Sequence, residues 1–576
     1  MKKLLIISLM CFSSLSTVGC AIENKNNNII DKNSNVSSSS SSTIMSSSSS
    51  KKNLEEGVDY IDHSITYDGH SFEYDETMWY INELKDVPLP DPHVYEEDGV
   101  YYITGTSDRT VGKVVDCYVT EDFVSYERYE IYSPNKYNGW ENDDSPEIYA
   151  PEIYKFGDKY YMYYSANDSI SPKSVRRNSV VVADNPIGPY KPIQTGKIDG
   201  LNEPIFNFDK ARGLDITIFE DDDGQLYMYY VTTESTQHIV GVKLKSPYEA
   251  DWTTRKALIM PGTKDTNSSE IELEWEIYRD NSLEIAEAPF MIKSDDKYYL
   301  TYSVNGCWNK YYNVCYAVSD SPLGDYTKPY EKGKLWTNLL LGYPSTNDPE
   351  DKVYQQWSGF ASGTGHHCFF YIGDQLMVGY HAHQNRDYDE SKSGYVKRYF
   401  AFDYVYFDDD GVPFCNGPTY SLQPLPEELS GYKNIAENAK LNRANLINEN
   451  AVNDNYIVDC YNLDNEENKE VILGKGKSYI ELEFDNEYEI GGMAIYNSAY
   501  YEKYIYEIEY IDFGNGNILY YPQFSVDGYV NDKKEFIYPC SAFTLEFKNT
   551  IFAEKVTLCF DLPNGGSINE IKVLGQ

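Results

Sequence analysis

The sequence has little positive charge. Its 576 residues include 49 Lys and Arg against 91 Asp and Glu, a formal net charge of −42. Proteins bind nucleic acid largely by neutralising phosphates with Lys and Arg, so this charge excludes a nucleic-acid partner. Disordered acidic chains are poor in aromatic residues, whereas Phe, Trp and Tyr make up 15% of this one. We therefore expect a folded protein with an acidic, Tyr-rich surface suited to a neutral, polyhydroxylated ligand.

Long apolar runs and paired cysteines are scarce as well. The apolar run at the N-terminus covers residues 4–12 and is too short to cross a bilayer. Eight cysteines follow Cys20 and are scattered without any CxxC pair. This spacing indicates neither a zinc site nor a disulfide framework.

The N-terminus follows the plan of an export signal, with Lys2 and Lys3, the apolar run and small residues before Cys20. Residues 17–20 resemble a bacterial lipobox, in which the cysteine is lipidated, although Thr17 stands where Leu is usual. Residues 21–55 are rich in Ser and Asn and predict a flexible tether. We expect an exported protein with signal peptide 1–20, anchored to the bacterial cell surface by a lipid on Cys20; a secreted protein is the alternative.

One pattern occurs five times: a turn with Asp or Gly, followed by an aromatic-rich strand. The copies begin at Asp98, Gly157, Asp223, Asp295 and Gly373. A short β-type run precedes each copy, so each is a predicted hairpin with a tight turn. Five hairpins, each with enough following chain for two more strands, predict an all-β, five-bladed β-propeller.

The first strand of each propeller blade lines the axis, so residues at one offset before each turn should converge. That position holds Asp91, Ala150, Asp215, Ala288 and His366, and Glu287 precedes Ala288. Taken alone, each carboxylate has an alternative reading as a turn or N-cap residue. Together, Asp91, Asp215 and Glu287 predict one site with the general acid, general base and third tuning group of a glycosidase.

The stretches around these residues resemble glycoside hydrolase family 43, five-bladed propeller enzymes that act on arabinose- and xylose-containing polysaccharides. The resemblance covers residues 87–426. Its motifs include residues 89–94, 150–153, 215–224, 287–290 and 363–367.

The resemblance implies a role for each carboxylate. Asp91 is the general base that activates a water, Glu287 is the general acid, and Asp215 orients Glu287 and raises its pKa. The family inverts the anomeric centre, which requires about 6.5 to 9.5 Å between acid and base. Ala288 replaces the glycine usual after the acid, which narrows the neighbouring subsite.

Three further residues are candidates for substrate binding. His366 faces an axial calcium or its water shell in relatives, so a structural calcium near the propeller axis is one reading and a hydrogen-bonding histidine the other. Otherwise we expect no required cofactor. Arg398 matches an arginine that faces the site, with a surface salt bridge as the alternative. Trp140 is either a sugar-stacking platform or a core residue.

After residue 426 the composition shifts, and short alternating strands predict a β-sandwich. We expect the propeller catalytic domain over residues 56–428 and the sandwich over 429–576. The opening and closing motifs of this second domain resemble discoidin-like, galactose-binding jelly rolls used as carbohydrate-binding modules. Aromatics in residues 500–504 are candidates for sugar contact, and a purely stabilising role is the alternative.

These features predict a glycosidase that cleaves arabinofuranosyl or xylosyl linkages in polysaccharides or oligosaccharides by inversion. Two alternatives stay open: a surface-tethered glycan-binding lipoprotein without catalysis, and a related propeller glycosidase acting on galactan. We expect a monomer that meets the membrane only through its N-terminal lipid.

Overall fold

The computed structural model describes most of the chain after residue 74, together with one short earlier strand. The described residues are 60–62, 74–82, 87–107, 112–137, 139–142, 144–169, 175–193, 197–198, 201–202, 206, 212–232, 237–262, 273–277, 285–308, 311–332, 334, 337–342, 361–384, 388–389, 394–395, 397–419, 421–457, 470–498, 503–505, 507–522 and 542–576. The signal, Cys20 and the tether lie outside them. No helix within these residues has the length and apolar character needed to cross a membrane.

Residues 93–415 contain five four-stranded antiparallel sheets, here called blades 1 to 5 in chain order. Their strands are β3 (His93–Glu97), β4 (Val100–Thr104), β5 (Val115–Thr120) and β6 (Glu127–Tyr132); β7 (Tyr149–Phe156), β8 (Lys159–Asn167), β9 (Arg176–Ala183) and β10 (Lys191–Pro192); β13 (Gly213–Glu220), β14 (Leu226–Thr232), β15 (His238–Ser246) and β16 (Glu249–Ile259); β17 (Ala286–Ser294), β18 (Lys297–Val304), β19 (Asn313–Ser319) and β20 (Leu339–Leu341); β21 (Ala361–Ile372), β22 (Gln375–Gln384), β25 (Tyr399–Phe407) and β26 (Pro413–Cys415).

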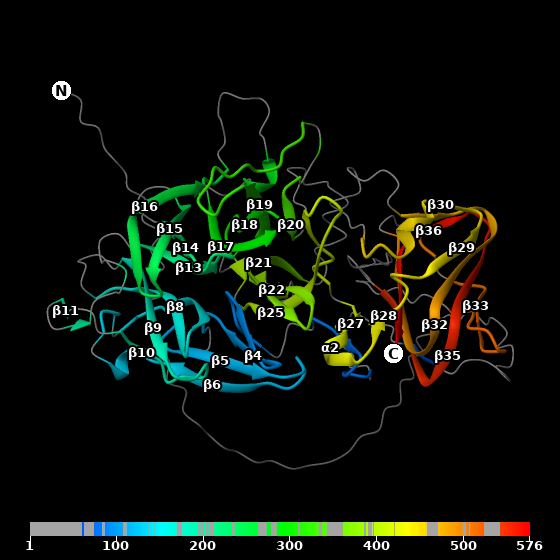
Figure 1. Cartoon of the computed structure of the whole chain (residues 1–576), viewed down its shortest axis with the longest axis horizontal. Coiled ribbons are helices and arrows are strands. Elements are labelled where there is room, and N and C mark those ends of the chain that lie inside the picture. Colours follow the sequence, from blue (N-terminus) through cyan, green and yellow to red (C-terminus); the bar gives the residue numbers. More distant parts are fainter. Residues whose placement is uncertain are drawn as a thin grey trace, which may run out of the picture. The chain divides into compact units, whose positions relative to one another are not determined.

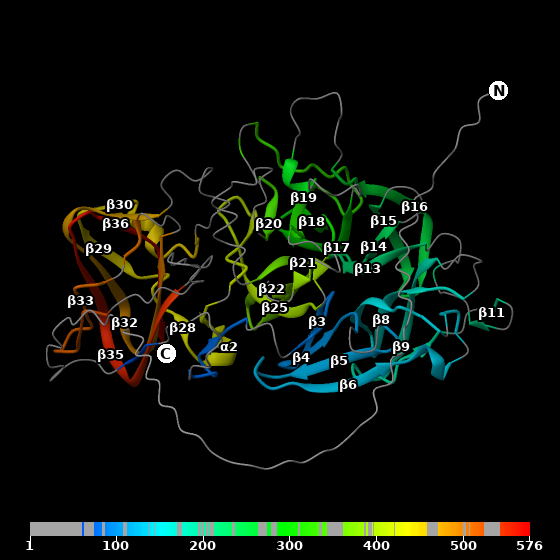
Figure 2. The same ribbon diagram turned by 180° about the vertical axis from the view of Figure 1, so that it is seen from behind.

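The first strands of the blades form a closed ring. β3 contacts β7, β7 contacts β13, β13 contacts β17, β17 contacts β21, and β21 returns to β3. Figure 1 shows the blades following one another in chain colours from blue to yellow-green, and Figure 2 shows them from behind. The prediction of an all-β fold with a five-bladed propeller is confirmed. Each predicted tight turn joins the first and second strands of a blade.

The chain before blade 1 is fastened to blade 5 and to the segment that follows it. β2 (Trp79–Tyr80) pairs with β27 (Gln423–Pro424). The Asn82 side chain donates to the Phe402 carbonyl over 3.0 Å and accepts from the Phe402 N–H over 3.1 Å. These bonds tie the first and last blades together.

Tyrosine fills the interior of the propeller. Nine of the twelve largest fully buried side chains of the described chain are tyrosines. Several donate their hydroxyl to a buried carboxylate: Tyr132 to Glu141 over 2.7 Å and Tyr302 to Glu276 over 2.7 Å. The expected Tyr-rich surface is therefore wrong for these residues, because the blade strands turn them inward and satisfy their hydroxyls there.

Residues 433–575 and a short early strand form the second sheet-rich region. Its strands are β1 (Tyr60–Asp62), β28 (Lys433–Asn434), β29 (Lys440–Ala444), β30 (Leu446–Ile447), β31 (Val471–Leu473), β32 (Gly476–Asn497), β33 (Tyr510–Asp512), β34 (Ile518–Tyr520), β35 (Ala542–Leu562) and β36 (Gly566–Gly575). All ten are linked in one network of pairs. Since β1 pairs with β35, the chain enters this region before it builds the propeller, which the expected boundary at residue 56 did not foresee.

The long strands β32 and β35 fold this network into two layers. Residues 476–483 of β32 pair with β29 and the end of β35, whereas residues 490–497 pair with β36 and the start of β35. Register shifts separate the two halves. Side chains from both halves, such as Leu482, Ile495 and Phe560, meet in one core cluster, as in a β-sandwich.

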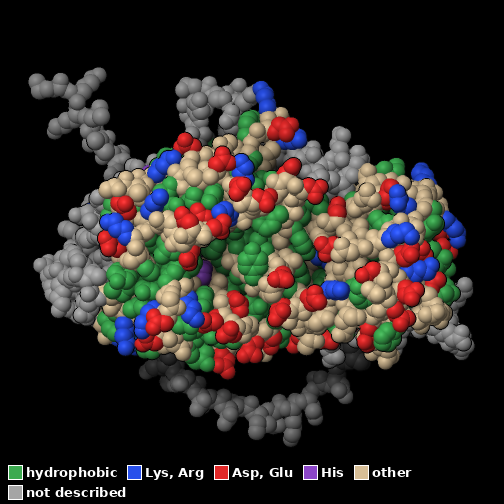
Figure 3. All heavy atoms as spheres, viewed as in Figure 1, with side chains coloured by type: hydrophobic (Ala, Val, Ile, Leu, Met, Phe, Trp, Pro, Cys, Tyr) green, Lys and Arg blue, Asp and Glu red, His purple; other side chains and the backbone are tan. Residues whose placement is uncertain are grey.

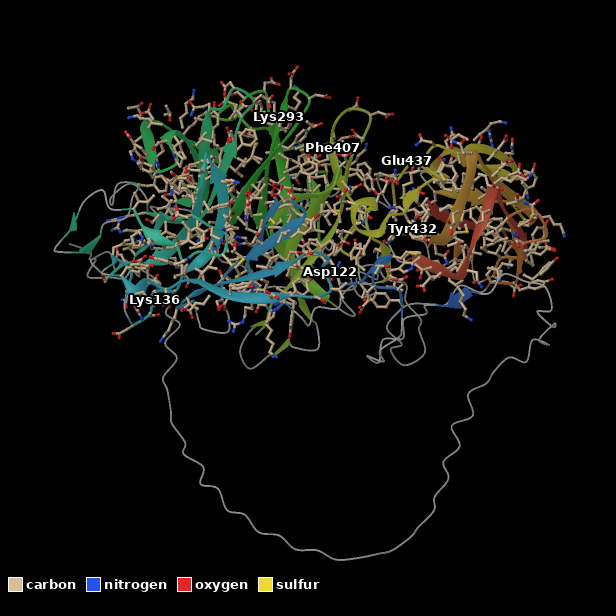
Figure 4. All side chains as sticks on the ribbon, turned by 60° about the horizontal axis from the view of Figure 1, so that its bottom comes forward. Asp122, Lys136, Lys293, Phe407, Tyr432 and Glu437 are labelled. Atoms are coloured by element: carbon tan, nitrogen blue, oxygen red, sulfur yellow. The ribbon has the colours of Figure 1, made fainter. Side chains whose placement is uncertain are left out.

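The propeller and the sandwich belong to one compact unit, residues 56–576. Trp79, Leu422 and Tyr496 share a buried cluster, against which the partly buried Tyr432 packs (Figure 4). Tyr496 also donates to the Gln423 side chain over 2.7 Å. Remaining short elements are β11 (Lys197–Ile198), β12 (Leu201–Asn202), β23 (Tyr388–Asp389), β24 (Gly394–Tyr395), α2 (Glu427–Ser430) and the 3-10 turns η2 (Pro134–Lys136), η3 (Glu274–Glu276) and η6 (Glu449–Val452).

Candidate active site

All five residues at the shared offset have the same backbone conformation. Asp91, Ala150, Asp215, Ala288 and His366 have φ values of 55°, 42°, 53°, 50° and 46°. Such left-handed geometry is uncommon without glycine, and its recurrence in all five blades indicates that the fold imposes it. In blades 2 to 5 the pairing register shifts beside this residue. The kink turns each of these residues out of the regular ladder at the start of the blade.

Asp91, just before β3, is held by four groups. Arg398 Nη1 donates to Asp91 Oδ1 over 2.8 Å, and His366 Nδ1 lies 3.2 Å from the same oxygen. Thr106 Oγ1 donates to Asp91 Oδ2 over 2.6 Å. The Asp91 N–H donates to His381 Nδ1 over 3.2 Å. The carboxylate is almost fully buried and its oxygens are fixed in place.

The electrostatics of Asp91 favour the ionised form. Burial alone would raise its pKa, but the charge of Arg398 above all, with His366, lowers it well below its ordinary value. Burial lowers the pKa of His381 to about 3, so this ring is neutral. Its Nδ1 accepts from the backbone of Asp91 and therefore carries no proton. Asp91 is thus an ionised carboxylate near neutral pH.

Asp215 on β13 and Glu287 on β17 have the opposite tendency. Burial, opposed by the attraction of His366 and assisted by the charges of Glu287 and Asp91, raises the pKa of Asp215 to about 7. Burial also raises the pKa of Glu287 to about 7. Asp215 Oδ2 accepts from the Ala288 N–H over 3.0 Å. Ala288 directly follows Glu287, so this bond brings Asp215 next to Glu287. The two form a coupled pair that holds protons near neutral pH.

The cause of the raised pKa of Glu287 differs from the expectation. Asp215 was expected to raise it. In the structure burial is the main cause, Asp91 adds to it, and the nearby Tyr312 hydroxyl and the charges of Arg176 and Arg398 oppose it. Repulsion between Asp215 and Glu287 is shared by the pair and raises the pKa of whichever carboxyl group ionises second.

His366 on β21 lies with the carboxylates, as expected from its offset. Its N–H donates to Ser303 Oγ over 2.9 Å, and its ring faces Asp91. In Figure 3 a His side chain is visible among hydrophobic side chains near the middle of the propeller, while Asp and Glu are scattered over the rest of that face.

A calcium ion near the propeller axis, with His366 facing the ion or its water shell, stays a prediction. Among the described residues, no group of three or more His, Cys, Asp or Glu side chains is arranged to hold a metal ion. The carboxylate nearest His366 already binds the Arg398 guanidinium. No step below therefore uses a metal.

The structure places the two other substrate-binding candidates, Arg398 and Trp140, in different surroundings. Arg398 contacts Asp91, and its side chain is mostly buried. His383 helps to place it, because its ring nitrogens lie 2.8 Å from the Lys397 carbonyl and 2.7 Å from the Cys307 carbonyl. Trp140 is only 3% exposed and packs in the core of blades 1 and 2, which is the alternative that the sequence left open.

Sequence reasoning missed three residues of the site. Thr106 Oγ1 accepts from the Ala150 N–H over 3.0 Å, so its proton is directed at Asp91. Tyr312 is fully buried, stacks on His381 at 5.4 Å between ring centroids, and approaches Glu287 closely enough to lower its pKa. Arg176 stacks over Tyr149 at 4.5 Å and lowers the pKa of Glu287. None of the three belongs to the repeated offset that revealed the others.

This arrangement combines an ionised proton acceptor with two carboxyl groups that keep a proton near neutral pH. All three lie at the starts of first strands, on one rigid ring. The combination is suited to general acid–base chemistry, in which one group takes a proton while another gives one.

The model of the family "Glycosyl hydrolases family 43" matches residues 82–413, more than half of the chain. The chain belongs to glycosyl hydrolase family 43. The family match spans all five blades of the propeller and includes every carboxylate of the site. It ends before the sandwich begins.

Curated relatives match about a third to two fifths of the chain. "Xylosidase/arabinosidase 43A" of Humicola insolens is 28% identical over 205 residues, 32% of this chain and 57% of the relative. "Extracellular endo-alpha-(1->5)-L-arabinanase 2" of Bacillus subtilis is 27% identical over 259 residues, 42% of this chain and 50% of the relative. The chain thus spans about half the length of the curated relatives it matches.

Solved structures resemble the same region. The crystal structure of an endo-1,4-beta-xylanase from Bacteroides thetaiotaomicron is 25% identical, with a TM-score of 0.45, and covers 58% of this chain and 96% of that one.

Proposed function

We propose that this family 43 chain is an inverting glycoside hydrolase that cleaves arabinofuranosyl or xylosyl linkages in polysaccharides or oligosaccharides. The observation that carries the proposal is the contrast within the site: Asp91 is held ionised, whereas burial raises the pKa of Glu287 to about 7. Hydrolysis of a glycosidic bond by inversion needs such a pair. The names of the relatives as arabinanases and xylosidases support the sugar class.

In this proposal Asp91 is the general base. Its carboxylate takes a proton from a water that attacks the anomeric carbon. Arg398 and Thr106 each donate to one of its two oxygens, which fixes the orientation of the carboxylate toward the attacking water. Holding the base in a fixed direction reduces the entropy lost on reaching the transition state.

Glu287 is the general acid in the same scheme. It gives its proton to the glycosidic oxygen as the bond to the anomeric carbon breaks, so the leaving sugar departs as a neutral alcohol. Its pKa of about 7 keeps it protonated in mildly acidic to neutral solution. Asp215 fixes the backbone of Ala288, the next residue, and thereby orients the acid.

Tyr312 and Arg176 are positioning residues for the acid. When Glu287 has lost its proton, the Tyr312 hydroxyl and the Arg176 charge stabilise the carboxylate that remains. They therefore act after proton transfer, and a fresh proton has to return before the next turnover.

The remaining parts of the chain fit an external polysaccharide as substrate. We propose that the protein is exported and anchored through Cys20, with residues 21–55 as the tether, and that the sandwich is a carbohydrate-binding module. Several relatives are named as extracellular, which supports export.

The proposal is tested with methoxyphenyl arabinofuranosides and xylosides, whose leaving groups need a proton, and the variants Asp91→Asn and Glu287→Gln. We expect each variant to lose at least about two decades of kcat/KM. Asp98→Asn, in the exposed turn of the same blade as Asp91, is the matched control and should keep full activity. Wild-type protein without turnover on any of these substrates would contradict the proposal and favour a non-catalytic binder.

A further inference from the structure

Three tyrosines form a row across one layer of the sandwich. Tyr479 on β32 lies opposite Cys559 on β35, Tyr510 on β33 lies opposite the same Cys559, and Tyr520 on β34 lies opposite Tyr510. Directly opposed residues of antiparallel strands point to the same face of a sheet. These four residues, called here the tyrosine row, therefore share one face.

That face is the outer one. The chain neighbours of the row, such as Ile480, Leu558 and Ile511, are fully buried in the core between the layers. Because side chains alternate along a strand, the row itself points to solvent. Tyr479 is 37% and Tyr520 is 49% exposed, and both count among the large exposed hydrophobic side chains of the chain.

The dimensions of the row suit a short stretch of polymer. Neighbouring strands are about 4.8 Å apart, so three strand spacings separate Tyr479 from Tyr520 by about 14 Å. This length fits an oligosaccharide rather than a single sugar. The rings of Tyr510 and Tyr520 lie 6.3 Å apart and are inclined at 55°, so they do not form a flat platform. A twisted chain can follow such rings, whereas the flat surface of a crystalline polymer cannot.

Polar side chains flank the row on the same face. On one side lies Lys477, whose Nζ contacts Glu509 over 3.1 Å. On the other side Glu481 accepts from Asn442 over 3.0 Å, Thr557 over 3.1 Å and Lys555 over 2.7 Å. These groups can exchange hydrogen bonds with sugar hydroxyls.

The charges of the flanks exclude an anionic ligand. Both lysines are paired with a carboxylate, and no cation of the described flank is left over to bind a phosphate or a carboxylate. A neutral ligand with many hydroxyls and apolar C–H faces fits both the rings and the flanks.

We propose that the tyrosine row binds a single, twisted chain of neutral polysaccharide of the arabinan or xylan type. The site extends the proposed function and rests on it for the sugar class. It is separate from the aromatics expected in residues 500–504, of which residues 500–502 lie outside the described chain. Each ring stacks on one face of a sugar, and the flanks bind hydroxyls along the edge.

The test compares the full-length chain with variants of the row by affinity electrophoresis in soluble arabinan and arabinoxylan. Tyr479→Val and Tyr520→Val remove the rings but keep a residue that favours strands. All proteins carry Glu287→Gln, so the polymer is not cleaved. Phe552→Val is the matched control, because Phe552 is 55% exposed on β35 but seven residues from Cys559, about 23 Å along the strand.

We expect each single variant to bind about threefold to tenfold more weakly and the double variant to lose retardation, with the control unchanged. Unchanged affinity in the double variant would overturn the site, as would a wild-type chain that hydrolyses aryl glycosides but is not retarded. Equally strong binding to crystalline cellulose would contradict the twisted chain. A change in oligomeric state in the double variant would make the row a protein contact instead.

Failure of this site is distinguishable from failure of the proposed function. Turnover of aryl glycosides, measured without Glu287→Gln, should be the same in all row variants, because these substrates reach only the propeller. If the wild-type chain does not hydrolyse aryl glycosides, the proposed glycosidase activity is contradicted. The affinity measurement then still decides whether the tyrosine row binds polysaccharide.

Discussion

The propeller and the sandwich use tyrosine in opposite ways. The core between blades 3 and 5 contains Tyr229, Tyr302 and Tyr380, whereas the buried cluster of the sandwich holds Ile, Leu, Val, Phe, Met and Ala and no tyrosine among its described members. In the propeller, buried tyrosine hydroxyls donate to carboxylates or backbone carbonyls, as Tyr302 does to Glu276 and Tyr229 to Pro322. In the sandwich, a core of aliphatic side chains and phenylalanines leaves tyrosines such as Tyr479 and Tyr520 at the surface. A high count of tyrosine therefore says nothing by itself about where ligands bind.

The largest expected effect belongs to the buried side of this comparison. Asp91→Asn and Glu287→Gln should each lower kcat/KM by about 100-fold or more, since each removes a proton acceptor or donor from the transition state. Steady-state kinetics on methoxyphenyl arabinofuranosides and xylosides measures the loss. In contrast, Tyr479→Val on the sandwich should leave these rates unchanged, and a comparable loss there would break the separation between the two regions.

The pH dependence of activity should reflect the lowered pKa of Asp91 and the raised pKa of Glu287. Asp91 has a lowered pKa and stays ionised as pH falls, so activity should persist well into the acid range. Glu287 must hold a proton, and its pKa is about 7, so activity should fall about tenfold per pH unit once pH rises above 7. A rate profile of kcat/KM from pH 4 to 9 tests this. Activity that instead rises through pH 7 would reverse the assignment of acid and base.

Stability should separate buried tyrosine hydroxyls from exposed ones. Tyr132→Phe removes a donor to the buried Glu141 and should lower the free energy of unfolding by about 1 to 3 kcal/mol. Tyr520→Phe, on the solvent face of the sandwich, should change it by less than about 0.5 kcal/mol. Urea unfolding followed by tryptophan fluorescence measures the free energy of unfolding of both variants. Equal losses of stability would contradict the distinction between buried and exposed tyrosine hydroxyls.

The smallest effect is expected at Tyr312. Tyr312→Phe keeps the ring stacked on His381 but removes the hydroxyl that lowers the pKa of Glu287. The alkaline limb of the kcat profile should therefore move up by about half a pH unit, while the acid limb set by Asp91 stays in place. Movement of both limbs together would indicate a general change of the site rather than a contact with the acid.

The repeat made the fold predictable, because tight turns and alternating strands are local signals. The same register led to Asp91, Asp215 and Glu287, and the structure shows why it works: each residue at the shared offset, or its neighbour, sits at a left-handed kink that recurs in every blade. Local signals of this kind survive folding because each blade is built from consecutive chain.

Other features depended on contacts between distant segments. Tyr312 reaches Glu287 in its own blade and His381 in the next one, and nothing in its sequence neighbourhood distinguishes it from dozens of other tyrosines. β1 has only three residues and pairs with β35 almost 500 residues later, so it carries no pattern of its own. Trp140 has the right residue type for a sugar platform, but its burial is decided by packing between blades 1 and 2.

The most direct test of the proposed mechanism compares leaving groups. A general acid matters most when the leaving group is a poor one, so Glu287→Gln should lose about 100-fold or more on a methoxyphenyl glycoside but little on a dinitrophenyl glycoside, which needs no proton to depart. Asp91→Asn should lose activity on both to a similar extent, because the attacking water is the same. If Glu287→Gln loses activity on both substrates to the same extent, Glu287 is not the general acid and the proposed mechanism is wrong.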